Sequence, residues 1–184
     1  MRWLLVLAIL IPTTLMASYE SPDYKVVSSE GSYEIRDYPA MTLVSTRMQN
    51  RSEDGSFMRL FGFISGSNAR GEKISMTTPV LMSGENSGTM SFIIPKEVAA
   101  KGTPAPASPE VSLSSVPTAR YAAYRYSGWV NPARERAVSR KLLEWVASQH
   151  LETDGTPVFA YYNPPWTLWF MRRNEVLVKI SPNR

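Results

Sequence analysis

Cationic, aromatic and methionine side chains gathered in two stretches of this chain are the residues whose types and spacing could do chemistry. The cations Arg59, Arg70 and Lys73 lie within fifteen residues of one another. Lysine and arginine bind carboxylates, and arginine does so in a bidentate fork. Aromatic rings and flexible methionine side chains pack well on flat ligands, although both also build ordinary cores. The residues of these two types that we consider are Phe57, Met58, Phe61, Met76, Tyr162 and Trp166.

Catalytic patterns find little support in the sequence. It contains no cysteine, which excludes thiol catalysis, disulfides and thiolate metal sites. Its one histidine, His150, excludes a site built from several histidines. Ser65 and Ser67 lie near glycines, but outside the strand, sharp turn and helix that expose a nucleophilic serine. The sequence therefore predicts a binding protein with no metal site of its own, and not an enzyme.

Composition and the N-terminus suggest one exported domain. The 184 residues are 43% hydrophobic, and the net charge of +4 is too weak to indicate a nucleic-acid partner by itself. Residues 1–17 combine Arg2, the apolar run Trp3–Ile11 and the small residue Ala17, which is typical of a signal peptide. The alternative is an uncleaved anchor, but the run is shorter than the roughly 20 residues that span a bilayer. We expect cleavage, no stable membrane anchor, and a single domain over 18–184 in the periplasm or medium.

The stretch 56–82 should position most of these residues. Phe57, Leu60, Phe61 and Ile64 recur at helical spacing, with Asp54 or Ser56 as the N-cap and Gly66 at the end. The residues that follow a basic glycine-rich turn, 73–82, alternate like a strand that Thr78-Pro79 interrupts. We expect this unit to form one wall of a ligand cleft.

The rest of the chain reads as the same arrangement repeated. Two strands around Pro39 precede the first helix, and two strands around Pro117 precede a second helix that starts at Asn131-Pro132. Strands follow each helix, with Pro79 and Pro164 in equivalent places. The prediction is an α+β fold: a distorted antiparallel sheet, curved or closed into a barrel, built from two strand-strand-helix-strand-strand halves with two flanking helices.

Five segments, in order, carry a resemblance to a known family. They are YEIRDYPA, FMRLFGFISGSNARGEKISMTTPV, SFIIP, TPAPASPEV and YYNPPWTLWFMRRNEV. Together they resemble the SOUL haem-binding family over about residues 24–181. The resemblance implies a distorted β-barrel with two helices, and haem or another tetrapyrrole bound non-covalently in a shallow apolar cleft beside the first helix. The fold is also similar to small-molecule sensor domains of the gyrase-inhibitor type.

One departure from the family bears on the iron. Some members ligate haem through a histidine where this chain has Asp37, and carboxylates are poor haem ligands. His150 should lie in solvent at the end of the second helix. We therefore expect binding without histidine ligation, through Phe57, Met58, Arg59, Phe61, Lys73, Met76, Tyr162 and Trp166. The first helix and the Pro164-Pro165 segment should face each other across the cleft.

The expected role is that of a tetrapyrrole carrier, buffer or scavenger. The alternatives are a binding module for other flat amphipathic molecules and an enzyme that removes metal from tetrapyrroles, because a bound cofactor can supply the chemistry itself.

Overall fold

The computed structural model of the chain describes residues 19–49, 55–84 and 88–181. The predicted signal peptide lies outside these residues. Ten strands form one antiparallel sheet: β1 (Lys25–Glu30), β2 (Tyr33–Tyr38), β3 (Met41–Arg47), β4 (Val80–Ser83), β5 (Thr89–Ile93), β6 (Val111–Val116), β7 (Ala119–Tyr126), β8 (Glu152–Thr153), β9 (Val158–Tyr161) and β10 (Asn174–Ser181). The helices are α1 (Ser56–Ile64), the short α2 (Lys96–Ala100) and α3 (Pro132–Ser148), with a 3-10 turn η1 (Trp169–Met171).

The strand order shows the internal repeat directly. The path through the sheet is β1-β2-β7-β10-β9-β4-β5-β3-β6, with β8 paired to the end of β10. The counterparts in the two halves are β2 and β6, β3 and β7, β4 and β9, and β5 and β10. Exchanging each strand for its counterpart reverses the order from β2 to β6. The centre is the β4–β9 pair, where Leu81 lies opposite Ala160. The predicted α+β fold with two similar halves is therefore confirmed, and the sheet is curved and open rather than closed.

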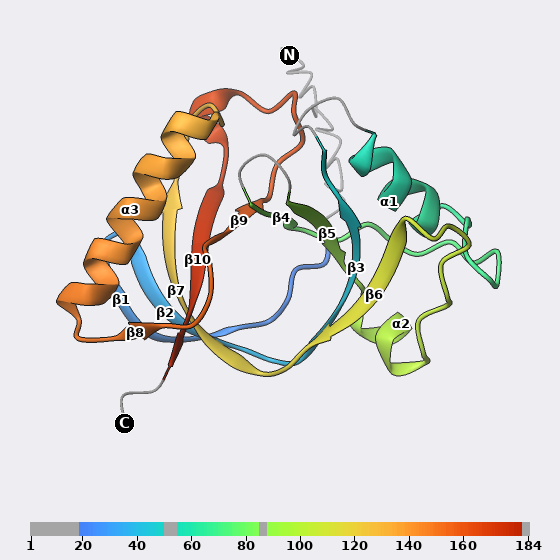
Figure 1. Cartoon of the computed structure of the whole chain (residues 1–184), viewed down its shortest axis with the longest axis horizontal. Helices are drawn as coiled ribbons and strands as arrows, with labels where there is room; N and C mark the ends of the chain where they lie inside the picture. Colours follow the sequence, from blue (N-terminus) through green and yellow to red (C-terminus); the bar gives the residue numbers. More distant parts are fainter. Residues whose placement is uncertain (1–18, 50–54, 85–87, 182–184) are drawn as a thin grey trace, which may run out of the picture.

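Each half also crosses the molecule once. β2 runs into β3 at Pro39, and β6 runs into β7 at Pro117, so the two strands of each pair end in different parts of the sheet. This exchange defines two lobes. The α1 lobe contains α1 with β3, β4, β5 and β6; the α3 lobe contains α3 with β2, β7, β9 and β10. Figure 1 shows α1 and α3 on opposite outer sides of the curved sheet.

Alternation along the strands separates a helix-covered face from a concave face. On β5, Met90 and Phe92 point to the α1 core, while Ser91 and Ile93 line the concave side. The α1 core joins Leu60, Phe63 and Ile64 to these residues and to Val44 of β3. On the other lobe, Val138, Leu142 and Val146 of α3 pack on Ala122, Val176 and Val178. Both helices therefore cover the convex face, and neither of them covers the concave face.

The N-terminal cap of α3 agrees with the prediction from the sequence, and the N-terminal cap of α1 does not. Asn131 caps α3 by accepting from the Arg134 amide at 2.9 Å, and Pro132 occupies the first turn, as predicted. The cap residue of α1 is Gly55, in a left-handed conformation with φ of 72°, and no side chain caps the helix. The prediction of Ser56 as cap is wrong because Ser56 is already the first helical residue; Asp54 lies outside the described residues.

Two further details correct the expected strands. β4 begins only after Pro79, so 73–78 is irregular chain and not strand. Pro79 precedes β4 whereas Pro164 follows β9, so the two prolines are not equivalent; Pro157, just before β9, takes the corresponding place. None of the helices in the described part of the chain is long and apolar enough to cross a membrane.

Candidate functional site

The outer face of α1 exposes apolar side chains that the core does not need. The helix buries Leu60, Phe63 and Ile64, while Phe57, Met58 and Phe61 remain 43%, 63% and 42% exposed. The rings of Phe57 and Phe61 stack with centroids 6.1 Å apart and planes 13° apart. Phe57 also contacts buried Phe92 edge-on at 5.3 Å, which fixes its position. The result is an apolar, largely aromatic surface exposed to solvent on the outer face of α1; we call these three residues the α1 platform.

The predicted cations and Met76 lie in the same lobe but make different contacts. Arg59 folds back onto β3, where Nε donates to Thr46 Oγ1 at 3.0 Å and Nη2 donates to the Arg47 carbonyl at 2.8 Å. Arg70 is paired with Glu72 at 3.1 Å. Lys73 is exposed, and Met76 is half-buried against the α1 core. Arg59 therefore ties α1 to the sheet, and Arg70 and Lys73 are the exposed cations in this group, with Arg70 held in its ion pair.

Trp166 belongs to a second exposed apolar surface, which we call the rim segment (residues 164–171). Its side chain is 82% exposed, and Leu168, Trp169, Phe170 and Met171 are also exposed. Arg172 holds the segment in place by donating from Nε to the Thr167 carbonyl at 2.9 Å and stacking 4.9 Å from the ring centre of Trp129. In Figure 1 the red-orange segment that contains η1 lies above α3, and the start of α1 lies in the upper part of the view on the other side of the sheet. That the platform and rim segment face each other across a cleft stays a prediction.

Tyr162 lies elsewhere, on the wall of a cavity of about 460 Å³ on the concave face of the sheet. We call it the concave cavity. Both lobes line it, and α1 does not contribute to its wall. The eight predicted residues are thus divided between the α1 lobe, the rim segment and the concave cavity.

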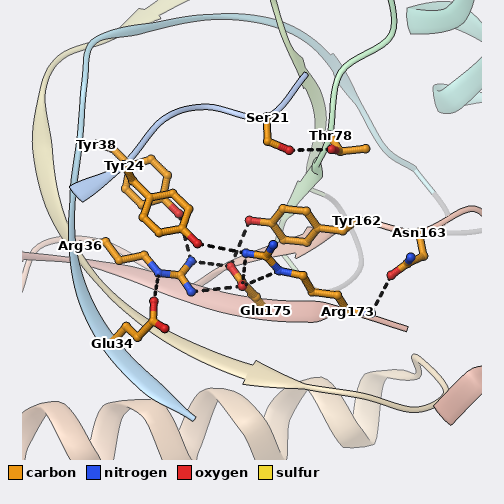
Figure 2. A network of polar contacts seen from close by, with 10 residues as sticks. All are labelled: Ser21, Tyr24, Glu34, Arg36, Tyr38, Thr78, Tyr162, Asn163, Arg173 and Glu175. Carbon is orange, nitrogen blue, oxygen red and sulfur yellow. Dashed lines mark hydrogen bonds and ion pairs between the residues drawn. The ribbon is translucent and has the colours of Figure 1, made fainter. Parts of the chain in front are cut away.

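A buried ionic cluster stands behind Tyr162, as Figure 2 shows. Glu175 of β10 receives Arg36 Nη1 at 2.6 Å and Nη2 at 3.1 Å, and Arg173 Nε at 2.9 Å. The Tyr162 hydroxyl donates to the same carboxylate at 3.1 Å. Arg173 is two residues from Glu175 in the sequence, whereas Arg36 lies 139 residues away.

Charges in this cluster are matched before any ligand arrives. Burial alone would raise the pKa of Glu175, but hydrogen bonds and charge from Arg36, with further help from Arg173, lower it below its ordinary value. Burial raises the pKa of Tyr38 to about 12 and raises that of Tyr162 as well. At neutral pH the cluster holds two arginines, the carboxylates of Glu34 and Glu175, and uncharged phenols.

Two further residues bear on the iron, Asp37 and His150. Asp37 forms a bidentate pair with Arg120, at 2.7 and 2.9 Å, and this hydrogen bonding lowers the pKa of the carboxyl. His150 is exposed just beyond the end of α3, as predicted. Within the described ranges, no three histidine, cysteine, aspartate or glutamate side chains are placed to hold a metal ion.

Comparison with known proteins identifies the chain at the level of family and fold. A family model described as "SOUL heme-binding protein" matches residues 19–179. No curated protein matches the chain. Among solved structures, the EcmrR C-terminal domain has a TM-score of 0.59 at 11% identity, over 87% of this chain and 99% of that one. A hydrolase from Listeria innocua has a TM-score of 0.56 at 10% identity, over 84% and 94%. At these identities the likeness shows the fold alone.

Proposed function

This protein belongs to the SOUL heme-binding protein family, and from that membership we propose that it is an exported carrier or buffer that binds haem or porphyrin on the α1 platform. Family membership supports tetrapyrrole binding as such. The place of binding, the mode of binding and the export are our proposals.

The single observation that supports the location is the exposed pair of stacked rings, Phe57 and Phe61, beside exposed Met58. A tetrapyrrole is a flat apolar ring, and removing apolar surface from water contributes about 25 cal/mol per Å². Phenylalanine faces and a methionine thioether are suited to contact such a ring. The residues present therefore fit the group that the family implies.

The propionates of a tetrapyrrole need cations at the edge of this surface. Lys73 is the exposed candidate, and the Arg59 guanidinium already has protein acceptors in Thr46 and Arg47. An exposed ion pair contributes about 0–1 kcal/mol, so these cations should orient the ring more than they hold it. Trp166 of the rim segment is a further candidate to cover the ring.

Iron would be held without histidine. Asp37 is engaged by Arg120, and His150 lies at the end of α3, in the other lobe. Bound haem would supply redox-active iron, while the protein binds the ring and limits its contact with water. A carrier of this kind should accept metal-free protoporphyrin as well as haem, because ring burial does not require the metal.

Haem and protoporphyrin IX titrations of the purified protein, followed by absorbance and tryptophan fluorescence, test the proposal. We expect both ligands to bind with similar affinity, His150→Ala to leave the haem spectrum unchanged, and bound haem to pass to apomyoglobin. Release of free iron from haem would instead identify the metal-removing enzyme. Failure of both ligands to bind, with other flat amphipathic molecules binding, would indicate the small-molecule sensor role.

Export is tested separately from binding. The motif in residues 1–17 supports cleavage after Ala17, so mass spectrometry of protein from the cell envelope or medium should find a chain that begins near Ser18. Intact Met1 on protein from the cytoplasm would contradict this part of the proposal.

A further inference from the structure

The concave cavity lies on the opposite face of the sheet from α1, and the proposed tetrapyrrole site does not use it. Its volume of about 460 Å³ falls within the roughly 300–1,000 Å³ of typical small-molecule pockets. Apolar side chains from both lobes make much of the wall, among them Leu43, Leu81, Ile93, Val158 and Leu177. Leu81 and Ala160 face each other across the β4–β9 pair at the centre of the repeat. The repeat thus builds this cavity from strands on both sides of its centre.

Charge is missing from the wall. None of the described residues that line the concave cavity is aspartate, glutamate, lysine, arginine or histidine. An ionic cluster, Arg36–Glu175–Arg173, stands behind Tyr38 and Tyr162. With Glu34 included, its two positive and two negative charges cancel. Burying an ion without a partner is strongly unfavourable, so the cavity disfavours anions and cations alike.

Serine and threonine hydroxyls of the α1 lobe supply one polar part of the wall, and the α3 lobe adds the phenols of Tyr38, Tyr121 and Tyr162. Ser45 and Ser91 share a hydrogen bond of 2.7 Å, and Ser83 and Thr89 share one of 2.9 Å. One hydroxyl of each pair donates to the other, so the accepting hydroxyl keeps a hydrogen that it can donate to a ligand oxygen. The wall therefore presents uncharged hydroxyl groups among apolar side chains, with the serine and threonine pairs in the α1 lobe.

We propose that the concave cavity is a second binding site, for an uncharged and mostly apolar small molecule with a carbonyl or hydroxyl oxygen. It is distinct from the tetrapyrrole site, because propionates carry two negative charges that this wall cannot match. The ligand's apolar body would contact Leu43, Leu81 and Leu177, and its oxygen would accept from the serine and threonine pairs.

A matched pair of fluorescent probes tests the charge preference. N-phenyl-1-naphthylamine is uncharged, and 1-anilinonaphthalene-8-sulfonate adds a sulfonate to the same skeleton; rhodamine 6G supplies a cation. We expect the uncharged probe to bind at least about tenfold more tightly than either ion, since the wall offers no counter-charge. Equal or tighter binding of the sulfonate or of the cation would overturn the proposal.

Two cavity-filling variants locate the probe. Leu81→Trp and Leu43→Trp each add bulk from a different strand, and the one that keeps the wild-type melting temperature is used. We expect a loss of at least about tenfold in affinity for the uncharged probe, because a filled cavity cannot seat it. Phe61→Ala on the α1 platform, and saturation with haem, should leave probe binding unchanged. Wild-type affinity in the filled variant that keeps the wild-type melting temperature, or displacement of the probe by haem, would refute a separate neutral site. Haem binding itself is judged on its own titration, so either result leaves it untouched.

Discussion

The two long helices occupy equivalent places in the repeat but present very different surfaces. α3 buries Val138, Leu142 and Val146 and exposes mainly charged side chains, including Arg136, Arg140, Lys141 and Glu144. α1 is about half as long, buries Leu60, Phe63 and Ile64, and exposes two phenylalanines and a methionine. Each helix has a complete inner face, so packing does not explain the outer face of α1.

The same contrast runs through the strands beneath them. On the concave side, the α3 lobe carries the saturated Arg36–Glu175–Arg173 cluster, whereas the α1 lobe carries paired hydroxyls. The ionic cluster of the α3 lobe satisfies its polar groups internally, which favours a rigid and stable framework. The α1 lobe leaves both apolar and hydroxyl groups available. We infer that one copy of the repeat supplies stability and the other supplies binding surface.

Removing a member of the ionic cluster should have the largest effect on stability. Arg36→Met leaves the fully buried Glu175 with Arg173 as its remaining arginine, and breaking a buried pair costs about 3–5 kcal/mol. Urea unfolding should show this loss in the free energy of unfolding. A loss below about 1 kcal/mol, the size of an exposed pair, would mean that the cluster does not stabilise the α3 lobe.

The next largest loss in the free energy of unfolding is expected from truncating a core residue of α3. Leu142 is fully buried, and Leu142→Ala should lower the free energy of unfolding by about 2–5 kcal/mol through the cavity it leaves. Haem affinity per folded molecule, titrated well below the melting temperature, should be unchanged. A weakened haem complex in this variant would show that the division of labour between the two lobes is wrong.

Acid should destabilise the protein in part through Glu175. Its folded-state pKa lies below its ordinary value of 4.5, so the stability it contributes is present above pH 4.5 and is lost as pH falls through the lower, folded value. Unfolding measured from pH 7 down to pH 3 should therefore show wild type losing more stability than Glu175→Gln. Parallel pH profiles for the two proteins would contradict the role of this carboxylate.

The smallest effect is expected from Lys73, an exposed cation that follows α1 in the chain. Lys73→Ala should weaken haem binding by about 1 kcal/mol or less, because the contact with a propionate stays in water. Trp166→Ala should weaken it more if the rim segment covers the ring. The reverse order in haem titrations would show that carboxylate recognition, rather than ring burial, dominates the affinity.

Much of the fold could be predicted because its signals are local. Period-two and period-3.6 patterns, Asn131-Pro132 and the prolines at 39 and 117 mark elements and their ends within a few residues. The α1 cap was missed because Gly55 acts through its left-handed backbone conformation, which a residue pattern does not reveal. The strand expected before Pro79 was missed because alternation alone does not supply a pairing partner, and Thr77 forms only an isolated bridge with Glu20.

The site was predicted less completely, because parts of it are formed by residues that are far apart in the sequence. The α1 platform follows from one helical stripe that is wider than a core requires. The concave cavity depends on β4 pairing with β9, and the ionic cluster on Arg36 meeting Glu175; neither partner is near in sequence. Strand order across the repeat is what brings them together.

The most direct test of the central claim compares Phe61→Ala on α1 with Leu143→Ala on α3, two truncations of exposed apolar residues on equivalent helices. Haem dissociation constants are measured for both, with melting temperatures as controls. We predict that Phe61→Ala weakens haem binding by about tenfold, near 1.4 kcal/mol, while Leu143→Ala leaves it at the wild-type value. Equal affinities in the two variants would contradict the claim that the α1 platform binds the tetrapyrrole ring.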